Sequence, residues 1–498
     1  MNFKPTLLTL SAIFLILGCN QREPADVILY NAKVYLLNSN FDTAEAIAIK
    51  EGKILAFASS EELLKKYSAG EQIDVQGKAI YPGLYDAHCH FSQFALQLQY
   101  ADLRGAKSLE EIVERLQTHQ QHYSPSYLMG MGWDQNLWAD KSMPSNALLN
   151  QHFPDIPVAL HRIDMHAILA NDTALTLAKI DANTPITGGE IVIENGKPTG
   201  LLIDNPMFLV EKTFPEPDEA TKKVLFQEAE QQCLALGLTT LTEAGLHRHE
   251  IEYLEQLIDE SALSLQFYAM ISDHEENLSY YLPQGIIKKP QLHIRSVKYF
   301  GDGALGSRGA ALKKPYSDLP HHHGKLLFDP NQLHQEATRI KLAGYQLNAH
   351  AIGDSTNYVL LKTFDEVLKD VPDPRWRIEH AQILDAPDFK FFSKKILASV
   401  QPLHATSDMY WAVDRVGETR IKTSYAYQSL LKQSGMLAFG TDFPVEVINP
   451  FHTFYAAITR QDLNQYPEGG FLPTEKVSRE NALRAMTIWA AYASFEEH

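Results

Sequence analysis

Residues 333–350, LHQEATRIKLAGYQLNAH, contain the repeating unit of the fold: a helical stretch, a glycine, and a short apolar strand that ends on a histidine. Apolar residues recur at helical spacing before Gly344, and the residues after it suit a buried strand. The same order occurs in residues 218–245 and 427–442. Repeated units of this kind predict an α/β fold with a parallel sheet and outer helices, and over this length they predict a (β/α)8 TIM-like barrel.

Two regions depart from this pattern. Residues 26–81 alternate apolar and polar positions between Asn, Gly and Asp, which predicts the short strands of a small β domain. We therefore place the N-terminal part of this domain at 19–80 and the barrel at 81–498. Loop signals crowd the residues from about 123 to 214, which predicts an insertion after the first barrel strand that forms a lid or a pocket wall.

The composition excludes one class of partner. With 498 residues, 45% of them hydrophobic, the chain can bury a large core. Its 44 basic and 61 acidic residues give a formal net charge of −17. Because nucleic-acid-binding surfaces are basic, this balance argues against a nucleic-acid partner.

The first residues form a candidate export signal, which we place at 1–18. A basic residue is followed by an apolar run from Leu7 to Leu17 that is short for a membrane span. The ending ILGC resembles a bacterial lipobox, which predicts an exported protein lipid-anchored at Cys19 and facing the periplasm. Asn20 after the cysteine favours the outer membrane. The alternative is an ordinary signal peptide with a cysteine near its cleavage site.

A pair of histidines ends the apolar run YPGLYDAHCHF, residues 81–91. Side chains alternate in a strand, so His88 and His90 point the same way and Cys89 points the other way. Cys89 and Cys233 both sit in apolar surroundings, and Cys19 is the only other cysteine. A disulfide framework is therefore not supported.

Four more polar side chains end predicted barrel strands: Lys298, His350, His380 and Asp442. Barrel active sites lie at the carboxyl ends of the strands, so these side chains and the histidine pair should converge. Taken singly, a histidine there is more often a hydrogen-bonded rim residue, and Gly-Thr-Asp is more often a helix cap. Together, imidazoles and a carboxylate suit Zn²⁺ and similar ions, so the set predicts a metal site.

These motifs resemble the amidohydrolase superfamily. YDAHCH, VKYF, NAHAIGD, IEHAQ and GTDFPV look like its barrel-strand motifs. GWDQNLW, HRIDMHAILAN, GDGALGSRGAAL and FGTDFPVEVINPF are similar to the YtcJ-like amidohydrolases, the branch that includes N-substituted formamide deformylase. The resemblance runs from about Asp26 to the last residue.

The resemblance implies one or two divalent metal ions, with Zn²⁺ expected. It makes His88 and His90 ligands of the more buried ion and His350 and His380 ligands of the second, with Asp442 completing the set. Lys298 aligns with the lysine that is N6-carboxylated and bridges both ions in binuclear members. Free lysine is a cation that would repel a metal, whereas a carbamate is an anion. The alternative is an unmodified Lys298 paired with Asp302 or another acid, and a single ion.

Asp442 is the expected catalytic residue. A metal lowers the pKa of a bound water to about 7 from 15.7, which makes hydroxide available at neutral pH. Asp442 would accept the proton and later deliver it to the leaving amine. A role as helix cap could coexist with catalysis.

Three residues are candidates for substrate binding: Trp133, His166 and Arg308. Trp133 and His166 lie in the predicted insertion, together with Asp134 and His161. Aromatic and histidine residues in an insertion are at least as often its own packing core. Arg308 could meet a substrate carboxylate or could cap a loop.

The leading prediction is a hydrolase that cleaves a non-peptide C–N bond in a small amide, formamide or cyclic amide. One alternative is a hydrolase of esters, lactones or dipeptides, and another is a non-catalytic lipoprotein that binds small molecules. Asp442 separates the last of these, because a binding protein does not need an acid-base residue beside the water.

The β domain departs from the family pattern. Members usually continue past MTIWAAYASFEE into strands that complete it, whereas this sequence ends at His498. Either the sequence is truncated, or the β domain is incomplete and has exposed edges, and we then expect a stability that depends on a partner or a homodimer.

Overall fold

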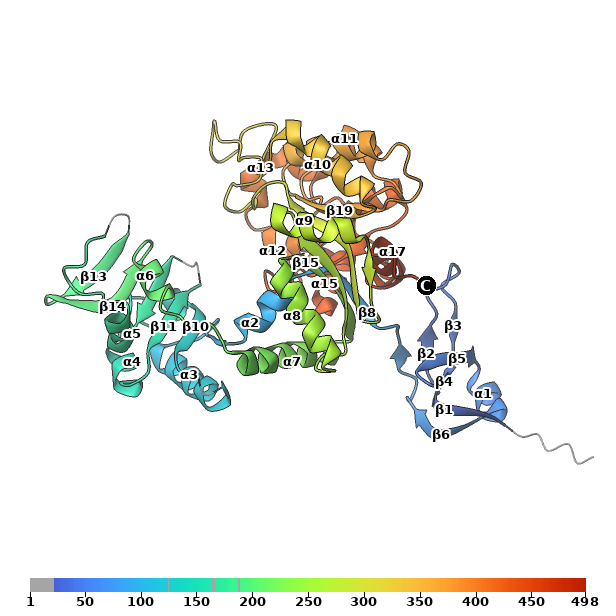
Figure 1. Ribbon diagram of the computed structural model, residues 1–498, viewed down its shortest axis with the longest axis horizontal. Coiled ribbons are helices and arrows are strands. Elements are labelled where there is room, and N and C mark those ends of the chain that lie inside the picture. The colour runs from blue at the N-terminus through green and yellow to red at the C-terminus, as the bar shows by residue number, and fades with distance from the viewer. Residues whose placement is uncertain (1–21, 124, 164–165, 187–188) are drawn as a thin grey trace, which may run out of the picture. The chain divides into compact units, whose positions relative to one another are not determined.

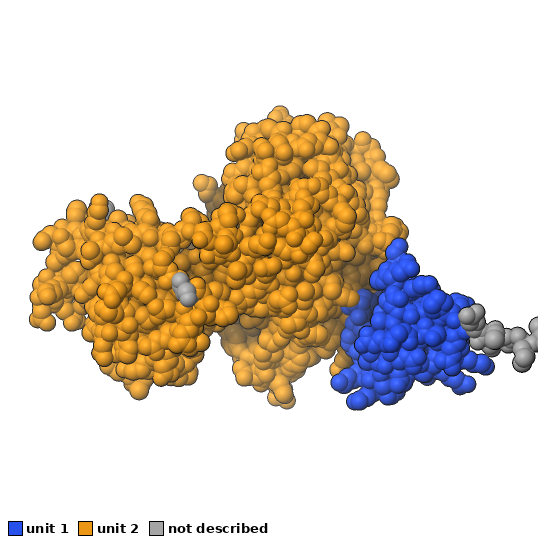
Figure 2. All heavy atoms as spheres, turned by 60° about the horizontal axis from the view of Figure 1, so that its bottom comes forward, with its two compact units in different colours: residues 1–82 blue, residues 83–498 orange. Residues whose placement is uncertain are grey.

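The computed structural model describes residues 22–123, 125–163, 166–186 and 189–498. The predicted signal peptide and Cys19 lie outside the described residues. The chain divides into two compact units, residues 1–82 and residues 83–498 (Figure 2). Within the described ranges, no helix is long and apolar enough to cross a membrane.

The first unit is a small β domain. One sheet has the order β5-β4-β1-β6 and a second the order β3-β2-β7. Ile28, Ala48 and Leu63 lie in its buried core, whereas edge strand β5 exposes Ile54 and Phe57. The elements are β1 (Glu23–Tyr30), β2 (Lys33–Tyr35), β3 (Thr43–Ala44), β4 (Ala46–Lys50), β5 (Lys53–Ala58), α1 (Ser60–Lys66), β6 (Tyr67–Asp74) and β7 (Ala79–Ile80).

The second unit contains the predicted (β/α)8 TIM-like barrel, which is confirmed. Eight strands pair in parallel in the order β8-β15-β16-β18-β19-β20-β21-β22, and β17 (Ile287–Lys288) pairs antiparallel with the beginning of β18. The strands are β8 (Leu84–Cys89), β15 (Leu238–Leu246), β16 (Gln266–Ser272), β18 (Leu292–Phe300), β19 (Gln346–Ala351), β20 (Trp376–His380), β21 (Ile396–Val400) and β22 (Ala438–Phe439). Every residue of β8, β20 and β21 is buried, as expected for strands covered on both faces.

Helices alternate with these strands and cover them: α7 packs on β15, α9 on β16, and α10 and α11 on β19 (Figure 1). The predicted helix at 218–237 begins where Asp218 accepts a hydrogen bond from Thr221 N, and it ends before Gly237, whose φ is 82°. The helices are α2 (Phe91–Gln97), α7 (Glu219–Ala235), α8 (Arg248–Asp259), α9 (Glu275–Tyr281), α10 (Pro330–Leu342), α11 (Asp354–Val367), α12 (Pro402–Asp408), α13 (Ala412–Arg420), α14 (Tyr427–Ser434), α15 (Pro450–Thr459), α16 (Arg479–Ala485) and α17 (Ile488–Ala493).

The barrel closes where β22 meets β8. Asp442 N donates to His88 O at 2.8 Å, and His90 N donates to Phe443 O at 2.8 Å. Gly440 permits this approach, because a Cβ there would lie 2.6 Å from His88 N. Closure therefore brings the histidine pair and Asp442 together.

The insertion forms its own sheet, in the order β13-β14-β12-β11-β10-β9. It begins at Tyr100 rather than near residue 123, because β9 belongs to this sheet and α3 packs on β9 and β10. The end of α3 also contacts Glu228 of the barrel helix α7. A helical pattern does not say which sheet the helix will cover. The elements are β9 (Tyr100–Asp102), α3 (Leu109–Tyr123), β10 (Leu128–Trp133), α4 (Ala147–His152), β11 (Val158–Arg162), β12 (Ala167–Ala170), α5 (Asp172–Leu177), β13 (Glu190–Glu194), β14 (Lys197–Ile203) and α6 (Met207–Glu211).

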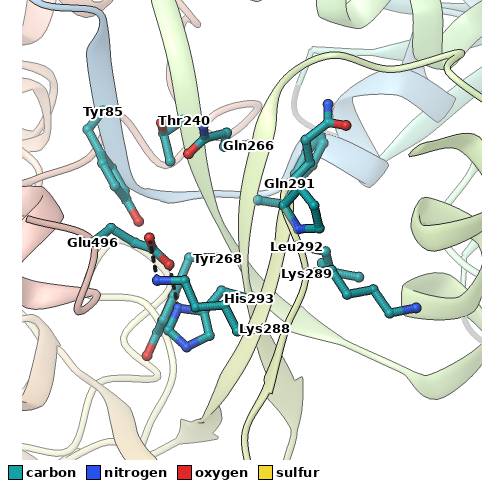
Figure 3. Close-up of a pocket in the computed structure, with 12 residues that line it drawn as sticks. Tyr85, Thr240, Gln266, Tyr268, Lys288, Lys289, Gln291, Leu292, His293 and Glu496 are labelled. Carbon is teal, nitrogen blue, oxygen red and sulfur yellow. Dashed lines mark hydrogen bonds and ion pairs between the residues drawn. The ribbon is translucent and has the colours of Figure 1, made fainter. Parts of the chain in front are cut away.

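The amino-terminal end of the barrel is filled by side chains. Glu496 pairs there with His293 and, at 3.0 Å, with Lys288 (Figure 3). The cavity beside them measures about 20 Å³, which is room for one water molecule. This cavity is therefore too small for a substrate.

Candidate metal centre

Three side chains at the carboxyl end of the barrel form a candidate metal centre. One donor atom each from His88, His380 and Asp442 lie within 4.8 Å of one another, and all three side chains are buried. His88 comes from β8, His380 ends β20, and Asp442 follows β22. Imidazole nitrogens and a carboxylate oxygen converging in this way fit a divalent metal ion.

His88 is held in the tautomer that a metal requires. Its Nδ1 donates to Glu379 Oε2 at 2.6 Å, which leaves the lone pair of Nε2 on the side of the centre. The Lys298 ammonium donates to that Nε2 at 3.0 Å. A carboxylate behind a ligating histidine fixes the ring and raises its basicity.

His380 and His350 complete the far side of the centre. His380 Nδ1 donates to Gln401 Oε1 at 2.8 Å, so its Nε2 also presents a lone pair. The rings of His350 and His380 lie 4.5 Å apart. His350 Nε2 is buried, lies 3.5 Å from Asp302 Oδ1 and has no hydrogen-bond partner within the described part of the chain, which suits a nitrogen that ligates a metal.

The remaining two predicted ligands lie at the edge of this group. His90 Nε2 is 3.2 Å from Asp442 Oδ1, and its side chain is 22% exposed. Lys298 is buried and contacts His88 rather than Asp302, whose carboxylate accepts backbone N–H groups of Ala311, Ile352 and Gly353. The structure thus brings together all six predicted metal-site residues.

The electrostatics favour neutral imidazoles. Burial, reinforced by the Lys298 ammonium, lowers the pKa of His88 to about 4 and that of His350 to about 3. Burial and His350 hold the pKa of His380 well below its usual range. Neutral imidazole is the form that ligates a metal at pH 7.

A histidine that the sequence did not single out lies behind Asp442. His404 of α12 places Nε2 3.2 Å from Asp442 Oδ2 and Nδ1 3.1 Å from Glu446 Oε1. Burial lowers the pKa of His404, but the two carboxylates outweigh it and raise the pKa to about 10. His404 therefore carries both protons and holds Asp442 Oδ2, so Oδ1 faces His88 and His90.

The backbone is strained at two of these residues. His380 has φ of 72° and Asp442 has φ of 62°, both in the left-handed region that non-glycine residues rarely adopt. Strain of this kind persists where surrounding contacts enforce it, and it concentrates at functional sites.

Cys89 lies on the opposite side of β8 from the histidine pair, as the alternation predicts. Its thiol is buried and donates to Thr242 O at 3.4 Å. Burial raises the pKa of this thiol far above its usual value.

The three predicted substrate contacts lie elsewhere. Trp133 is fully buried in the core of the insertion and donates to Leu160 O at 2.8 Å. His166 is exposed, with Nδ1 2.8 Å from Asp204, and Arg308 makes a bidentate pair with Asp318. None of the three lines the cavity beside the centre.

That cavity measures about 460 Å³ and opens beside His90. Its wall comes from α2, from the end of β15 and from α8, with Gln99, Tyr100 and Met131 of the insertion. A volume of several hundred Å³ is typical of small-molecule sites. The cavity therefore has room for a small substrate beside His90, the residue of the candidate centre that lines it.

The Amidohydrolase family model matches residues 71–498. The chain belongs to the Amidohydrolase family. This confirms the resemblance to the YtcJ-like branch that the motifs predicted. Together with the His88, His380 and Asp442 cluster, it identifies the chain as a metal-dependent hydrolase.

Several proteins are similar to this chain over most of their length. Protein LONG AFTER FAR-RED 3 of Arabidopsis thaliana is 32% identical, covering 95% of this chain and 84% of that protein. The putative amidohydrolase YtcJ of Bacillus subtilis is 28% identical, covering 94% and 90%. N-substituted formamide deformylase of Arthrobacter pascens is 24% identical, covering 94% and 89%.

A solved structure supports the fold. An uncharacterized metal-dependent hydrolase from Pyrococcus horikoshii superposes with a TM-score of 0.76 at 29% identity, covering 94% of this chain and 93% of that one. The barrel and the insertion are therefore shared with another protein of this kind.

Proposed function

We propose that this amidohydrolase cleaves a non-peptide C–N bond, in an amide, formamide or cyclic amide. The observation that carries the proposal is the buried Asp442, whose Oδ1 lies 3.2 Å from His90 and 3.6 Å from His88 while Oδ2 is held by His404. Breaking a C–N bond requires a proton for the leaving amine, and a fixed carboxylate beside the metal ligands can supply it. The name of the similar formamide deformylase points to the same bond.

In this mechanism the protein positions and moves protons. A divalent ion would polarise the substrate carbonyl and acidify a water molecule. Asp442 Oδ1 accepts a proton from the attacking water and returns it to the amine nitrogen, so the carboxylate is regenerated. Glu379 and Gln401 keep His88 and His380 in the ligating tautomer throughout.

We further propose Zn²⁺ as the ion and N6-carboxylation of Lys298. Burial lowers the pKa of Lys298 to about 8, which increases the fraction of neutral amine. Neutral amine adds to CO2 and releases a proton, giving a carbamate anion that can ligate two ions. A carbamate signal in carbon-13 NMR after loading with labelled bicarbonate, absent in Lys298→Met, would support this step, and one ion per chain without that signal would oppose it.

The location of the protein is a separate proposal. The apolar run from Leu7 to Leu17 and the following Gly18-Cys19 support export and a lipid anchor at Cys19. Metabolic labelling with palmitate should mark the wild-type chain and not Cys19→Ala. Equal labelling, or none in either, would contradict the anchor.

The function is tested by metal analysis and hydrolysis of N-formyl amines and simple amides, beside the corresponding esters. We expect bound zinc, loss of metal in His88→Ala, and a fall of at least about 100-fold in kcat in Asp442→Asn. Faster hydrolysis of the esters would favour the ester alternative. A folded, zinc-supplemented protein without metal would refute the centre.

A further inference from the structure

The cavity beside His90 has an unusual polar lining. Its wall contains the carboxylates of Glu243 and Glu250 and the carboxamides of Gln93, Gln97 and Gln99. No lysine or arginine is among the described residues that line it. A ligand in this cavity therefore meets hydrogen-bond acceptors and negative charge, with no cation to pair with a carboxylate.

Both carboxylates are fixed in place. Glu243 is buried at the end of β15, and its two oxygens accept the backbone N–H groups of Phe91 and Ser92. Glu250, in the first turn of α8, accepts His247 N at 2.7 Å. Each carboxylate has lone pairs left for a ligand. Preorganised acceptors of this kind do not have to be ordered when the ligand binds.

A third acceptor is unused. Ser92 is among the residues that line the cavity, and its hydroxyl is buried and lacks a hydrogen-bond partner within the described ranges. An unpaired buried hydroxyl is costly, so a polar ligand atom would stabilise it. Ser92 is two residues from His90 along the chain, and both residues line this cavity.

We propose that this cavity selects amides whose substituent carries a cationic, hydrogen-bond-donating group such as a primary ammonium or a guanidinium, and that it rejects substituents bearing a carboxylate. The inference rests on the proposed C–N hydrolysis and names its substrate class. N-acyl amino acids and dipeptides would be poor substrates.

A matched series of three formamides tests the selectivity: the N-formyl derivatives of pentylamine, of 1,5-diaminopentane and of 6-aminohexanoate. They share the scissile bond and an unbranched five-carbon chain on the amide nitrogen, and they differ in the charge at the end of that chain. With the zinc-loaded full chain, we expect kcat/KM to be at least about tenfold higher for the cationic compound than for the anionic one. Equal values, or a preference for the anion, would overturn the proposal.

Variants locate the effect in the cavity. Glu250→Gln should reduce the preference for the cation over the anion to less than about threefold. Gln93→Lys places a cation on an exposed position of α2 and should shift the preference toward the anion, which keeps the test valid if Glu250→Gln does not fold. The control is Glu252→Gln on α8, whose carboxylate pairs with Arg248 outside the cavity and should leave the preference unchanged.

A binding measurement separates this inference from the proposed function. Calorimetry with 1,5-diaminopentane and with 6-hydroxyhexanoate probes the cavity without hydrolysis. Binding of the diamine alone, weakened in Glu250→Gln, supports the cavity assignment even if no formamide is cleaved, in which case only the proposed reaction fails. Hydrolysis of the neutral formamide without any charge preference would leave the reaction standing and refute the selectivity.

Discussion

The imidazole of His88 and the carboxylate of Glu379 form a fully buried pair, with Nδ1 2.6 Å from Oε2. The other oxygen of Glu379 accepts Arg377 Nε at 2.7 Å, and Arg377 is also fully buried. The carboxylate of Glu379 therefore serves both the salt bridge with Arg377 and the predicted metal ligand His88.

Glu379→Gln should weaken both metal binding through His88 and the salt bridge with Arg377. Loss of the charge behind His88 should lower metal affinity about 10–100-fold. It also leaves Arg377 as an uncompensated buried cation, which should cost about 3–5 kcal/mol of unfolding free energy. Metal titration and denaturant unfolding measure the two effects. The control is Glu275→Gln, which removes an exposed pair with Arg339 and should cost no more than about 1 kcal/mol.

His404→Asn should separate metal binding from turnover. Without the imidazole, Asp442 Oδ2 loses its hydrogen bond, so the carboxylate is no longer oriented while the metal ligands remain. We expect kcat to fall about 100-fold, with little change in KM or zinc content. Glu446→Gln, which removes only the outer partner of His404, should cost less. Loss of zinc in proportion to activity would contradict a positioning role.

Gly440→Ala should damage the closure of the barrel at the metal centre. An added methyl group would meet the backbone of His88, which predicts a loss of about 1–3 kcal/mol and weaker metal binding. Gly435→Ala provides the control, since its φ is 81° but nothing lies within 4 Å of the added Cβ. It should lower stability through backbone strain and leave metal affinity unchanged. Equal metal affinity in both variants would contradict the steric argument.

His161 should make stability depend on pH. It is buried in the insertion, 3.7 Å from Glu211, and burial lowers its pKa to about 4 from an unfolded value of about 6.5. Between about pH 6.5 and pH 4, this histidine binds a proton in the unfolded chain but not in the folded chain. Stability should therefore be fully present above pH 6.5 and fall as the pH drops toward 4, by on the order of 3 kcal/mol.

Denaturant unfolding of the wild type and His161→Gln at pH 7.0 and 4.5 isolates this contribution as the difference between their pH dependences. The exposed His334 on α10 supplies the control, because His334→Gln should change stability by less than about 0.5 kcal/mol at both pH values. Identical pH dependence in the wild type and His161→Gln would rule out the assignment.

Periodicity along the chain was sufficient to predict the barrel. The helix, glycine and strand units recur, and alternation on one strand put His88 and His90 on one side with Cys89 on the other. These are local properties, set by backbone geometry over a few residues. The start of the insertion could not be predicted from local properties, because α3 is an ordinary amphipathic helix and tertiary packing decides which sheet it covers.

The partners of the metal ligands were not predictable for the same reason. Glu379 adjoins His380 in sequence yet orients His88, almost three hundred residues away. His404 follows β21 within QPLHATSD, and its position one turn into a helix after a barrel strand was the available signal. Tryptophan is a residue type that often lines pockets, but Trp133 is buried in the core of the insertion because of the strands that pack around it.

Cys89 provides a chemical reporter on β8, the strand that carries His88. Thiol reagents attack the thiolate, and the buried thiol of Cys89, whose pKa is raised, is protected for as long as β8 stays paired with its neighbouring strands. Its labelling rate therefore measures how often that strand opens. If a bound ion links β8 to β20 and β22, removal of the ion by a chelator should accelerate the labelling of Cys89 while the rest of the barrel stays folded. The rate at which this one thiol is modified would then report how often the metal centre opens in the intact enzyme.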